Sequence, residues 1–88
     1  MKKEKIVSSM AIGKLLREEF DKYEIAYDPH KKGEAGKRYG DVFQVVRENA
    51  SVETTDTGHY MYNESEAKKL IRREVKKIAK RLYKKQSE

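Results

Sequence analysis

The segment 67–85, which reads AKKLIRREVKKIAKRLYKK, constrains the fold of this chain more than any other stretch. Its apolar residues recur at intervals of four, three and four, the heptad spacing of a helix that buries one side. That stripe consists of Ile71, Val75, Ile78 and Leu82, and it is widened by Leu70, Ala79 and Tyr83. We expect the stripe to pack onto the first helix and onto the β-hairpin described below; the alternative is a dimer seam, either in place of this packing or together with it.

Positive charge is concentrated in the same part of the chain. The sequence contains 21 Lys and Arg residues against 15 Asp and Glu residues, a formal net charge of +6 at pH 7. Residues 64–88 hold ten of the basic and four of the acidic residues, so they account for the whole excess. A second basic patch is HKKGEAGKRYG, residues 30–40. Because like charges on one element repel each other, this distribution indicates an anionic partner.

Length and residue usage are typical of a small single-domain protein. The 88 residues suffice for one domain that spans 1–88. No Cys is present, which excludes disulfides and thiolate zinc sites. No stretch approaches the roughly 18 apolar residues of a membrane span, and no signal-peptide core follows the charged N-terminus. We therefore expect a cytoplasmic protein of a bacterium or of the host of a mobile genetic element, with no membrane partner.

An amphipathic helix is predicted at residues 9–23. Its apolar residues follow helical spacing and are Ile12, Leu15, Leu16, Phe20 and Tyr23. Ser8 or Ser9 can cap its start. Gly13 costs about 1 kcal/mol relative to Ala in a helix, so its presence indicates that another element packs closely there.

The segment after this helix is expected to be less regular. A short strand is predicted at 23–27, because Tyr-Glu-Ile-Ala-Tyr has the composition of a strand. Asp28-Pro29 would end it. The three glycines within residues 30–40 favour a loop, or at most one weak helical turn.

Residues 41–49 permit two interpretations. As a short helix, the segment would begin at Asp41 as the N-cap, with Gln44 as the N3 partner of a capping box. As a strand, residues 42–47 would use their valines, since β-branched residues favour sheets. Periodicity does not decide between the two over so short a run.

A β-hairpin is predicted at residues 51–62. Two strand-like runs flank residues 56–58, Asp-Thr-Gly, which suit a three-residue loop with Gly in the left-handed conformation. Asn63 or Ser65 then caps the C-terminal helix. Ser65 is favoured, because Glu66 follows it in the first turn.

Nothing in the sequence indicates catalysis or a metal centre. Residues 56–58 match the tripeptide of aspartic proteases, but Thr54 and Thr55 precede it where those enzymes have an apolar strand. His30 and His59 are far apart in sequence and no Cys accompanies them. The glycines lack the spacing of a phosphate-binding loop. We expect a non-enzymatic protein with no cofactor and no metal.

The order of helix, short strand, capped short helix and hairpin over residues 9–62 resembles a winged helix-turn-helix domain, an α+β fold. The resemblance implies that residues 41–49 form the recognition helix in the major groove of DNA, and that residues 51–62 form the wing. It also implies base contacts, in which Gln pairs with adenine and Arg with guanine. The candidates for base contacts are Gln44, Arg47, Thr55, Thr57, His59 and Tyr60. The candidates for phosphate contacts are Lys31, Lys32, Lys37, Arg38, Lys68, Lys69, Arg72, Arg73, Lys76, Lys77, Lys80 and Arg81.

Two other interpretations stay open at this point. If residues 42–47 form a strand, the order of one helix, three strands and a last helix resembles a double-stranded-RNA-binding domain. In that case Lys68 and Lys69, within SEAKKLIRR, would contact phosphates as the Lys-rich start of that family's last helix does. A third class is a small phage-type inhibitor or adaptor that binds another protein. We favour a small protein of a plasmid, phage or bacterium that binds double-stranded DNA as a homodimer. It would act in transcription regulation or as an accessory factor in DNA processing.

Overall fold

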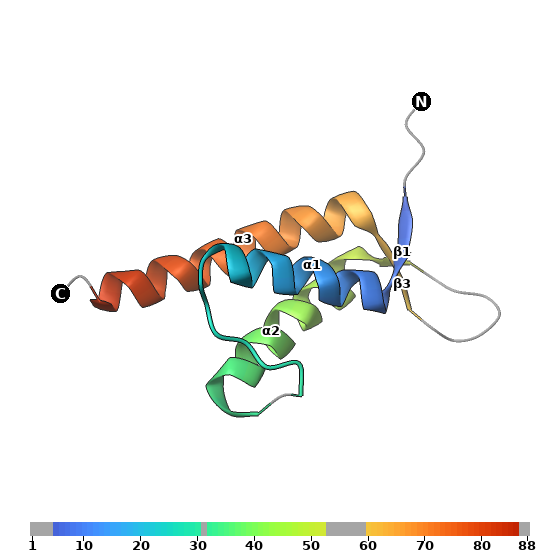
Figure 1. Ribbon diagram of the computed structural model, residues 1–88. Coiled ribbons are helices and arrows are strands. Elements are labelled where there is room, and N and C mark those ends of the chain that lie inside the picture. The colour runs from blue at the N-terminus through green and yellow to red at the C-terminus, as the bar shows by residue number, and fades with distance from the viewer. Residues whose placement is uncertain (1–4, 31, 53–59, 87–88) are drawn as a thin grey trace.

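The computed structural model describes residues 5–30, 32–52 and 60–86 of the chain (Figure 1). These residues form an α+β domain with three helices and a small antiparallel sheet, which confirms the α+β class that was predicted. In chain order the elements are β1 (Ile6–Ser8), α1 (Ser9–Lys22), α2 (Gly33–Ala50), β2 (Ser51–Val52), β3 (Met61–Asn63) and α3 (Glu64–Gln86). The sheet lies at the end of the domain where α1 and α3 begin and α2 ends (Figure 1).

The predicted hairpin is confirmed where the structure describes it. β2 and β3 pair in antiparallel orientation, with Val52 opposite Met61. β3 lies in the middle of the sheet and pairs on its other side with β1, where Val7 is opposite Tyr62. The predicted turn at residues 56–58 lies outside the described residues. β1 was not expected from the sequence, because three residues show no readable alternation.

The first helix matches its prediction closely. Ser8 is the N-cap, since the Ala11 N–H donates to its hydroxyl oxygen over 3.4 Å. The helix buries Ile12, Leu16 and Phe20 in the domain core. Its apolar spacing therefore determined both its extent and its buried face.

The predicted strand at 23–27 is wrong. Glu24 adopts a left-handed conformation with φ of 56°, and the Ile25 N–H donates to the Phe20 carbonyl oxygen over 2.9 Å. The chain therefore closes the helix with a tight turn, and Ile25 is buried in the core instead of joining the sheet. The strand that pairs with β3 on the side away from β2 is β1, which lies near the N-terminus.

The predicted loop at 30–40 is also wrong, because α2 begins at Gly33. Gly33 has a φ of 61°, which suits glycine at the point where the chain enters the helix. Gly36 is buried, and Tyr39 and Phe43 follow it at helical spacing and pack against the core. Burial of this face outweighs the roughly 1 kcal/mol that each glycine costs in a helix.

Because α2 starts so early, two further predictions for this region fail. Asp41 lies in the middle of the helix, so it is not an N-cap, and Gln44 is not part of a capping box. Residues 42–47 are helical, which makes the strand interpretation wrong. The element order on which the resemblance to a double-stranded-RNA-binding domain depended is therefore absent from the described residues.

The last helix buries its predicted stripe within its own chain. Ile71, Val75 and Ile78 are buried and Leu82 is half-buried, and α3 packs against α1, α2 and β3. Its N-cap is Asn63, which accepts hydrogen bonds from the Glu66 N–H over 3.1 Å and from the Ser65 hydroxyl over 3.0 Å. The preference for Ser65 as the cap was wrong.

A row of aromatic rings connects the end of α1 to the sheet. Successive rings are stacked, tilted or, for the last pair, edge-to-face, with centroid separations of 5.6 to 6.2 Å, in the order Phe20, Tyr27, Tyr39, Phe43 and Tyr62. Burial raises the pKa of the Tyr39 hydroxyl, against the opposing charge of Arg17. A methyl group at Gly13 would lie 2.8 Å from the Tyr39 hydroxyl oxygen, so the expected close packing at Gly13 is confirmed. The row thus fixes α2 against α1.

Candidate nucleic-acid interface

The solvent-exposed side of α3 carries an almost continuous layer of positive charge. Between residues 69 and 81 all seven basic side chains are exposed, namely Lys69, Arg72, Arg73, Lys76, Lys77, Lys80 and Arg81. Glu74 is the single acidic residue in that range. With 3.6 residues per turn, the seven side chains cover about half of the circumference, opposite the buried stripe. We call this surface the cationic face of α3.

Carboxylates of the same molecule neutralise the cationic face only in part. Glu74 lies 3.3 Å from both Arg73 and Lys77, and Lys69 lies 3.9 Å from Glu66. Such exposed pairs contribute little and are screened by salt. Within the part of the chain that the structure describes, no ion pair involves the other basic side chains of the face, which are Arg72, Lys76, Lys80 and Arg81.

Three of these side chains form a straight row. Arg72, Lys76 and Lys80 are spaced four residues apart, so the row extends over about 12 Å at 1.5 Å per residue. Duplex DNA carries one negative charge per ~1.7 Å of its axis, so such a row faces several phosphates at once. The spacing therefore suits a polyanion better than a single small anion.

The cationic face is held on a rigid support. Ile71 and Val75, on the opposite side of the same turns, are only 1% and 0% exposed. Near the C-terminal end, the Tyr83 hydroxyl donates a hydrogen bond to the Tyr23 carbonyl oxygen and ties α3 to the end of α1. A polyanion would therefore meet a preformed surface, and little backbone entropy is lost on binding.

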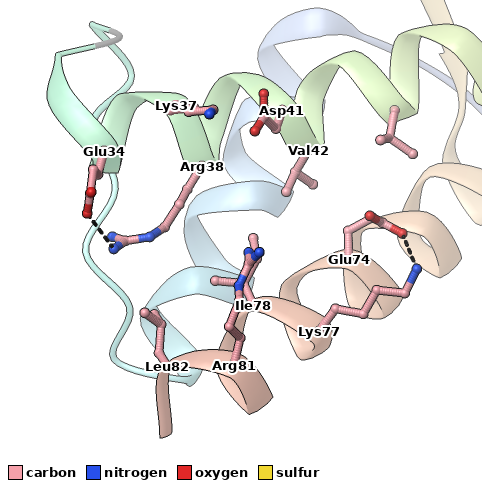
Figure 2. A pocket seen from close by; sticks show the side chains of 11 residues that line it. Glu34, Lys37, Arg38, Asp41, Val42, Glu74, Lys77, Ile78, Arg81 and Leu82 are labelled. Carbon is pink, nitrogen blue, oxygen red and sulfur yellow. Dashed lines mark hydrogen bonds and ion pairs between the residues drawn. The ribbon is translucent and has the colours of Figure 1, made fainter. Parts of the chain in front are cut away.

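An open hollow lies on each side of α3. The α1-side hollow has a volume of about 430 Å³ and is lined by Glu19, Lys22, Tyr23, Arg72, Arg73 and Lys76. The α2-side hollow has a volume of about 630 Å³, and Figure 2 shows it between α2 and α3. Its charged lining residues are Glu34, Lys37, Arg38, Asp41, Glu74, Lys77 and Arg81. Its apolar floor is formed by Val42, Val45, Ile78 and Leu82.

The exposed side of α2 differs from the cationic face of α3 in its charge. Its 18 residues contain three basic and three acidic residues, so its charges cancel. Arg47 is exposed and held in place, with its guanidinium 5.4 Å from the ring centre of Phe43 and 5.5 Å from that of Tyr60. It also donates to the Gln44 side-chain oxygen over 3.5 Å. Gln44, Arg47 and Tyr60, which were predicted as base contacts, therefore form one local cluster.

The other predicted contacts are distributed unevenly. Lys31, Thr55, Thr57 and His59 lie outside the described residues. Lys37 and Arg38 meet Lys77 and Arg81 across the α2-side hollow. Two predicted phosphate contacts are engaged elsewhere. Lys68 lies 3.6 Å from Glu64, and Arg38 donates to the Ala26 carbonyl oxygen over 3.0 Å. Lys32 is exposed at the start of α2.

Lys22 belongs to the candidate site, although the sequence did not predict it as a contact. It lies on α1, which contains both basic and acidic residues, and it has no distinguishing neighbour in the sequence. It enters the α1-side hollow because the end of α1 packs beside the middle of α3. Its ammonium also lies 5.9 Å from the ring centre of Tyr23.

Comparison of the chain with protein-family models, with curated proteins and with solved structures finds no match. Among the helices that the structure describes, none is long and apolar enough to cross a membrane. In the same residues, no three or more His, Asp or Glu side chains gather in a way that could hold a metal ion.

Proposed function

We propose that this protein is a non-enzymatic double-stranded-DNA-binding protein and that the cationic face of α3 is its main contact with the phosphates. One observation carries the proposal. Arg72, Lys76 and Lys80 form an exposed row on a helix fixed by its buried stripe, and no ion pair involves them within the described residues. A polyanion bound to this row would relieve the repulsion between these charges.

DNA suits this surface better than a membrane does. Helices that lie on membranes insert an exposed apolar face between the lipids. The apolar side chains of α3 are instead buried against α1 and α2, and Tyr83 is the one large apolar side chain exposed on the described part of α3. Lysine and arginine side chains that meet DNA phosphates release condensed counterions, which makes binding favourable at low salt.

The cluster of Gln44, Arg47 and Tyr60, on α2 and beside the hairpin, provides a second candidate contact with DNA outside the cationic face. Gln44 and Arg47 are exposed on that helix, and the Arg47 guanidinium is restrained between two rings. A restrained guanidinium loses less entropy when it pairs with a base or a phosphate.

The test is a salt titration of DNA binding with one matched pair of variants. The probe is a fluorescent 20-base-pair duplex of random sequence, followed by anisotropy from ~50 to ~300 mM salt. We expect binding whose logarithm falls linearly with the logarithm of the salt concentration. Arg72→Ala/Lys80→Ala should reduce that slope by about 1.8, at 0.9 per lost phosphate contact.

The control is Lys14→Ala/Arg17→Ala, which also removes one lysine and one arginine from an exposed helix surface. It should leave the slope unchanged, because neither residue belongs to the cationic face or lines either hollow. Absence of binding by the unmodified protein at ~50 mM salt would overturn the proposal. Tighter binding of a duplex RNA of the same sequence would overturn it in favour of RNA.

A further inference from the structure

The cationic face of α3 is not a flat surface but a ridge between two hollows. On one flank the α1-side hollow gathers four basic side chains, Lys22, Arg72, Arg73 and Lys76. On the other flank the α2-side hollow also gathers four, Lys37, Arg38, Lys77 and Arg81. Each hollow takes its cations from α3 and from one flanking helix. Positive charge therefore lines both sides of the ridge at a comparable position along α3.

The dimensions of such a ridge match those of a DNA groove. An α-helix with its side chains has a diameter of about 10–12 Å. The major groove of duplex DNA is about 12 Å wide and about 8.5 Å deep, and it is bounded by two phosphate backbones. A helix that enters this groove has one backbone on each flank, so it needs cations on both flanks.

We propose that α3 itself enters the major groove, and that each of the two hollows receives one of the two phosphate backbones. This inference rests on the proposed function and specifies how the same face binds. It assigns a contact role to Lys22, which the sequence did not single out. It also assigns α3, and not the helix that precedes the hairpin, as the element in the groove.

Docking through α2 fits the charges less well. Glu34, Asp41 and Glu48 are all exposed on α2, and carboxylates close to phosphates repel them. The connection from α1 to α2 spans residues 23–32, whereas a helix-turn-helix motif uses a turn of about 3–4 residues. Both observations weaken α2 as the helix that lies in the groove.

Docking along a single backbone also leaves part of the structure unused. A helix that lies over one strand presents one flank to phosphates and turns the other away. The cations of the second hollow would then lie away from the phosphates, although residues of two different helices converge there. Major-groove entry uses both sets at once.

The two hollows are not equal in charge. The α1-side hollow contains one carboxylate, that of Glu19, against four basic groups. The α2-side hollow contains three, those of Glu34, Asp41 and Glu74, against four basic groups. Glu34 pairs with Arg38 and Glu74 with Lys77 of the same hollow, and Glu74 also lies 3.3 Å from Arg73 of the α1-side hollow. Asp41 has no ion pair among the described residues. The α1-side hollow should therefore hold its phosphates more strongly.

The experiment compares one double variant for each hollow by the same salt titration on the 20-base-pair duplex. Lys22→Ala/Arg72→Ala addresses the α1-side hollow and Lys37→Ala/Arg81→Ala addresses the α2-side hollow. Each removes one lysine from a flanking helix and one arginine from α3. We expect each to lower the salt slope by about 1.8 and the quadruple variant to lower it by about 3.6. The control Lys14→Ala/Arg17→Ala should leave the slope unchanged, and circular dichroism checks that every variant stays folded.

The outcomes separate this inference from the proposed function. If one hollow variant lowers the slope and the other does not, α3 lies along one backbone and the inference is overturned, while DNA binding stands. If neither lowers it although the unmodified protein binds, another face meets DNA and the inference is again overturned. If the unmodified protein does not bind at all, the proposed function fails first.

Chemical protection supplies an independent readout of the groove. Dimethyl sulfate methylates guanine N7 in the major groove and adenine N3 in the minor groove, which are the edges that distinguish the two grooves. On a short saturated duplex we expect protection of guanine N7 and none of adenine N3. Protection of adenine N3 alone would overturn the inference. Duplex RNA should bind more weakly, because its major groove is too deep and narrow to admit a helix.

Discussion

The two long helices α2 and α3 bury their apolar sides in the same core, but the charges of α2 cancel whereas α3 presents a cationic surface to solvent. α2 has three basic and three acidic residues among 18, and α3 has ten basic and three acidic residues among 23. α2 contributes Tyr39 and Phe43 to the row of aromatic rings, whereas α3 contributes an aliphatic stripe. Their buried sides have equivalent roles, so function has to be read from the exposed sides.

Burial of the aliphatic stripe also explains why the surface of α3 tolerates so much charge. Repulsion between exposed cations destabilises a folded chain by small amounts that salt reduces. Burial of several aliphatic side chains stabilises it by more, at about 25 cal/mol per Å² of apolar surface. The buried side of α3 thus fixes the helix, and the exposed side is available for a ligand. Variants can test whether the buried side controls stability and the exposed side controls binding.

The largest expected effect comes from the buried side of α3. Ile71→Ala removes a side chain that is 1% exposed, and large-to-small changes of this kind cost about 2–5 kcal/mol. We expect the free energy of unfolding, measured with urea, to fall by about 3 kcal/mol. The salt slope of DNA binding, measured under conditions where the variant is folded, should not change.

The exposed side of α3 provides the matched comparison. Arg72→Ala/Lys80→Ala should change the free energy of unfolding by no more than about 0.5 kcal/mol, as is usual for surface positions. A loss close to that of Ile71→Ala would mean that the cations stabilise the fold. The separation between the two sides of α3 would then be wrong.

A smaller effect is expected where α2 packs against α1. Gly13→Ala improves helix propensity by about 1 kcal/mol, but the new methyl group would lie 2.8 Å from the Tyr39 hydroxyl oxygen. Overpacking costs about 1–3 kcal/mol. We therefore expect a net loss of about 1 kcal/mol in urea unfolding.

Tyr39→Phe is the control for this close contact, because it removes the hydroxyl and keeps the ring in its stack. In the Tyr39→Phe background, Gly13→Ala should no longer destabilise the protein. An unchanged loss in that background would show that the helix backbone itself, and not the ring of α2, requires glycine at this position.

The difference between α2 and α3 also explains what the sequence could predict. The stripe of α3 and the apolar residues of α1 extend over several turns, so their periodicity predicted both helices and their buried sides. α2 was missed over residues 33–40, because Gly33, Gly36 and Gly40 disfavour a helix locally. Its inner face is stabilised by packing against α1, which no local pattern reveals.

The predictions for the short strands failed for a related reason. β1 has three residues, and its strand conformation depends on its pairing with β3. The segment 23–27 has the composition of a strand but no neighbouring strand to pair with, and Glu24 turns the chain instead. Strand composition describes what a pleated, half-buried surface accepts, so it does not by itself locate a strand.

The sequence predicted the site residues that are neighbours on α3 but not those that packing brings to α3 from other helices. The cations of α3 were found because they are contiguous in sequence. The two hollows were not predicted, since the basic residues of each come from two helices and those of the flanking helix lie at least 39 positions from those of α3. Lys22 is the clearest case, because it has no local signal and gains its position only through packing.

The last prediction concerns Asp41, a carboxylate that α2 contributes to the α2-side hollow. Asp41 lines the α2-side hollow, is exposed, and has no ion pair within the described residues. If a phosphate backbone enters this hollow, Asp41→Asn removes a repulsion comparable to an exposed charge pair, about 0.7 kcal/mol. We expect DNA affinity at ~50 mM salt to rise about threefold, with a smaller gain at higher salt because exposed charges are screened. Glu48→Gln is the control, since Glu48 is equally exposed on α2 but lines neither hollow. Equal gains from both variants would mean that α2 as a whole faces the DNA, and the distinction drawn between the two helices would fail.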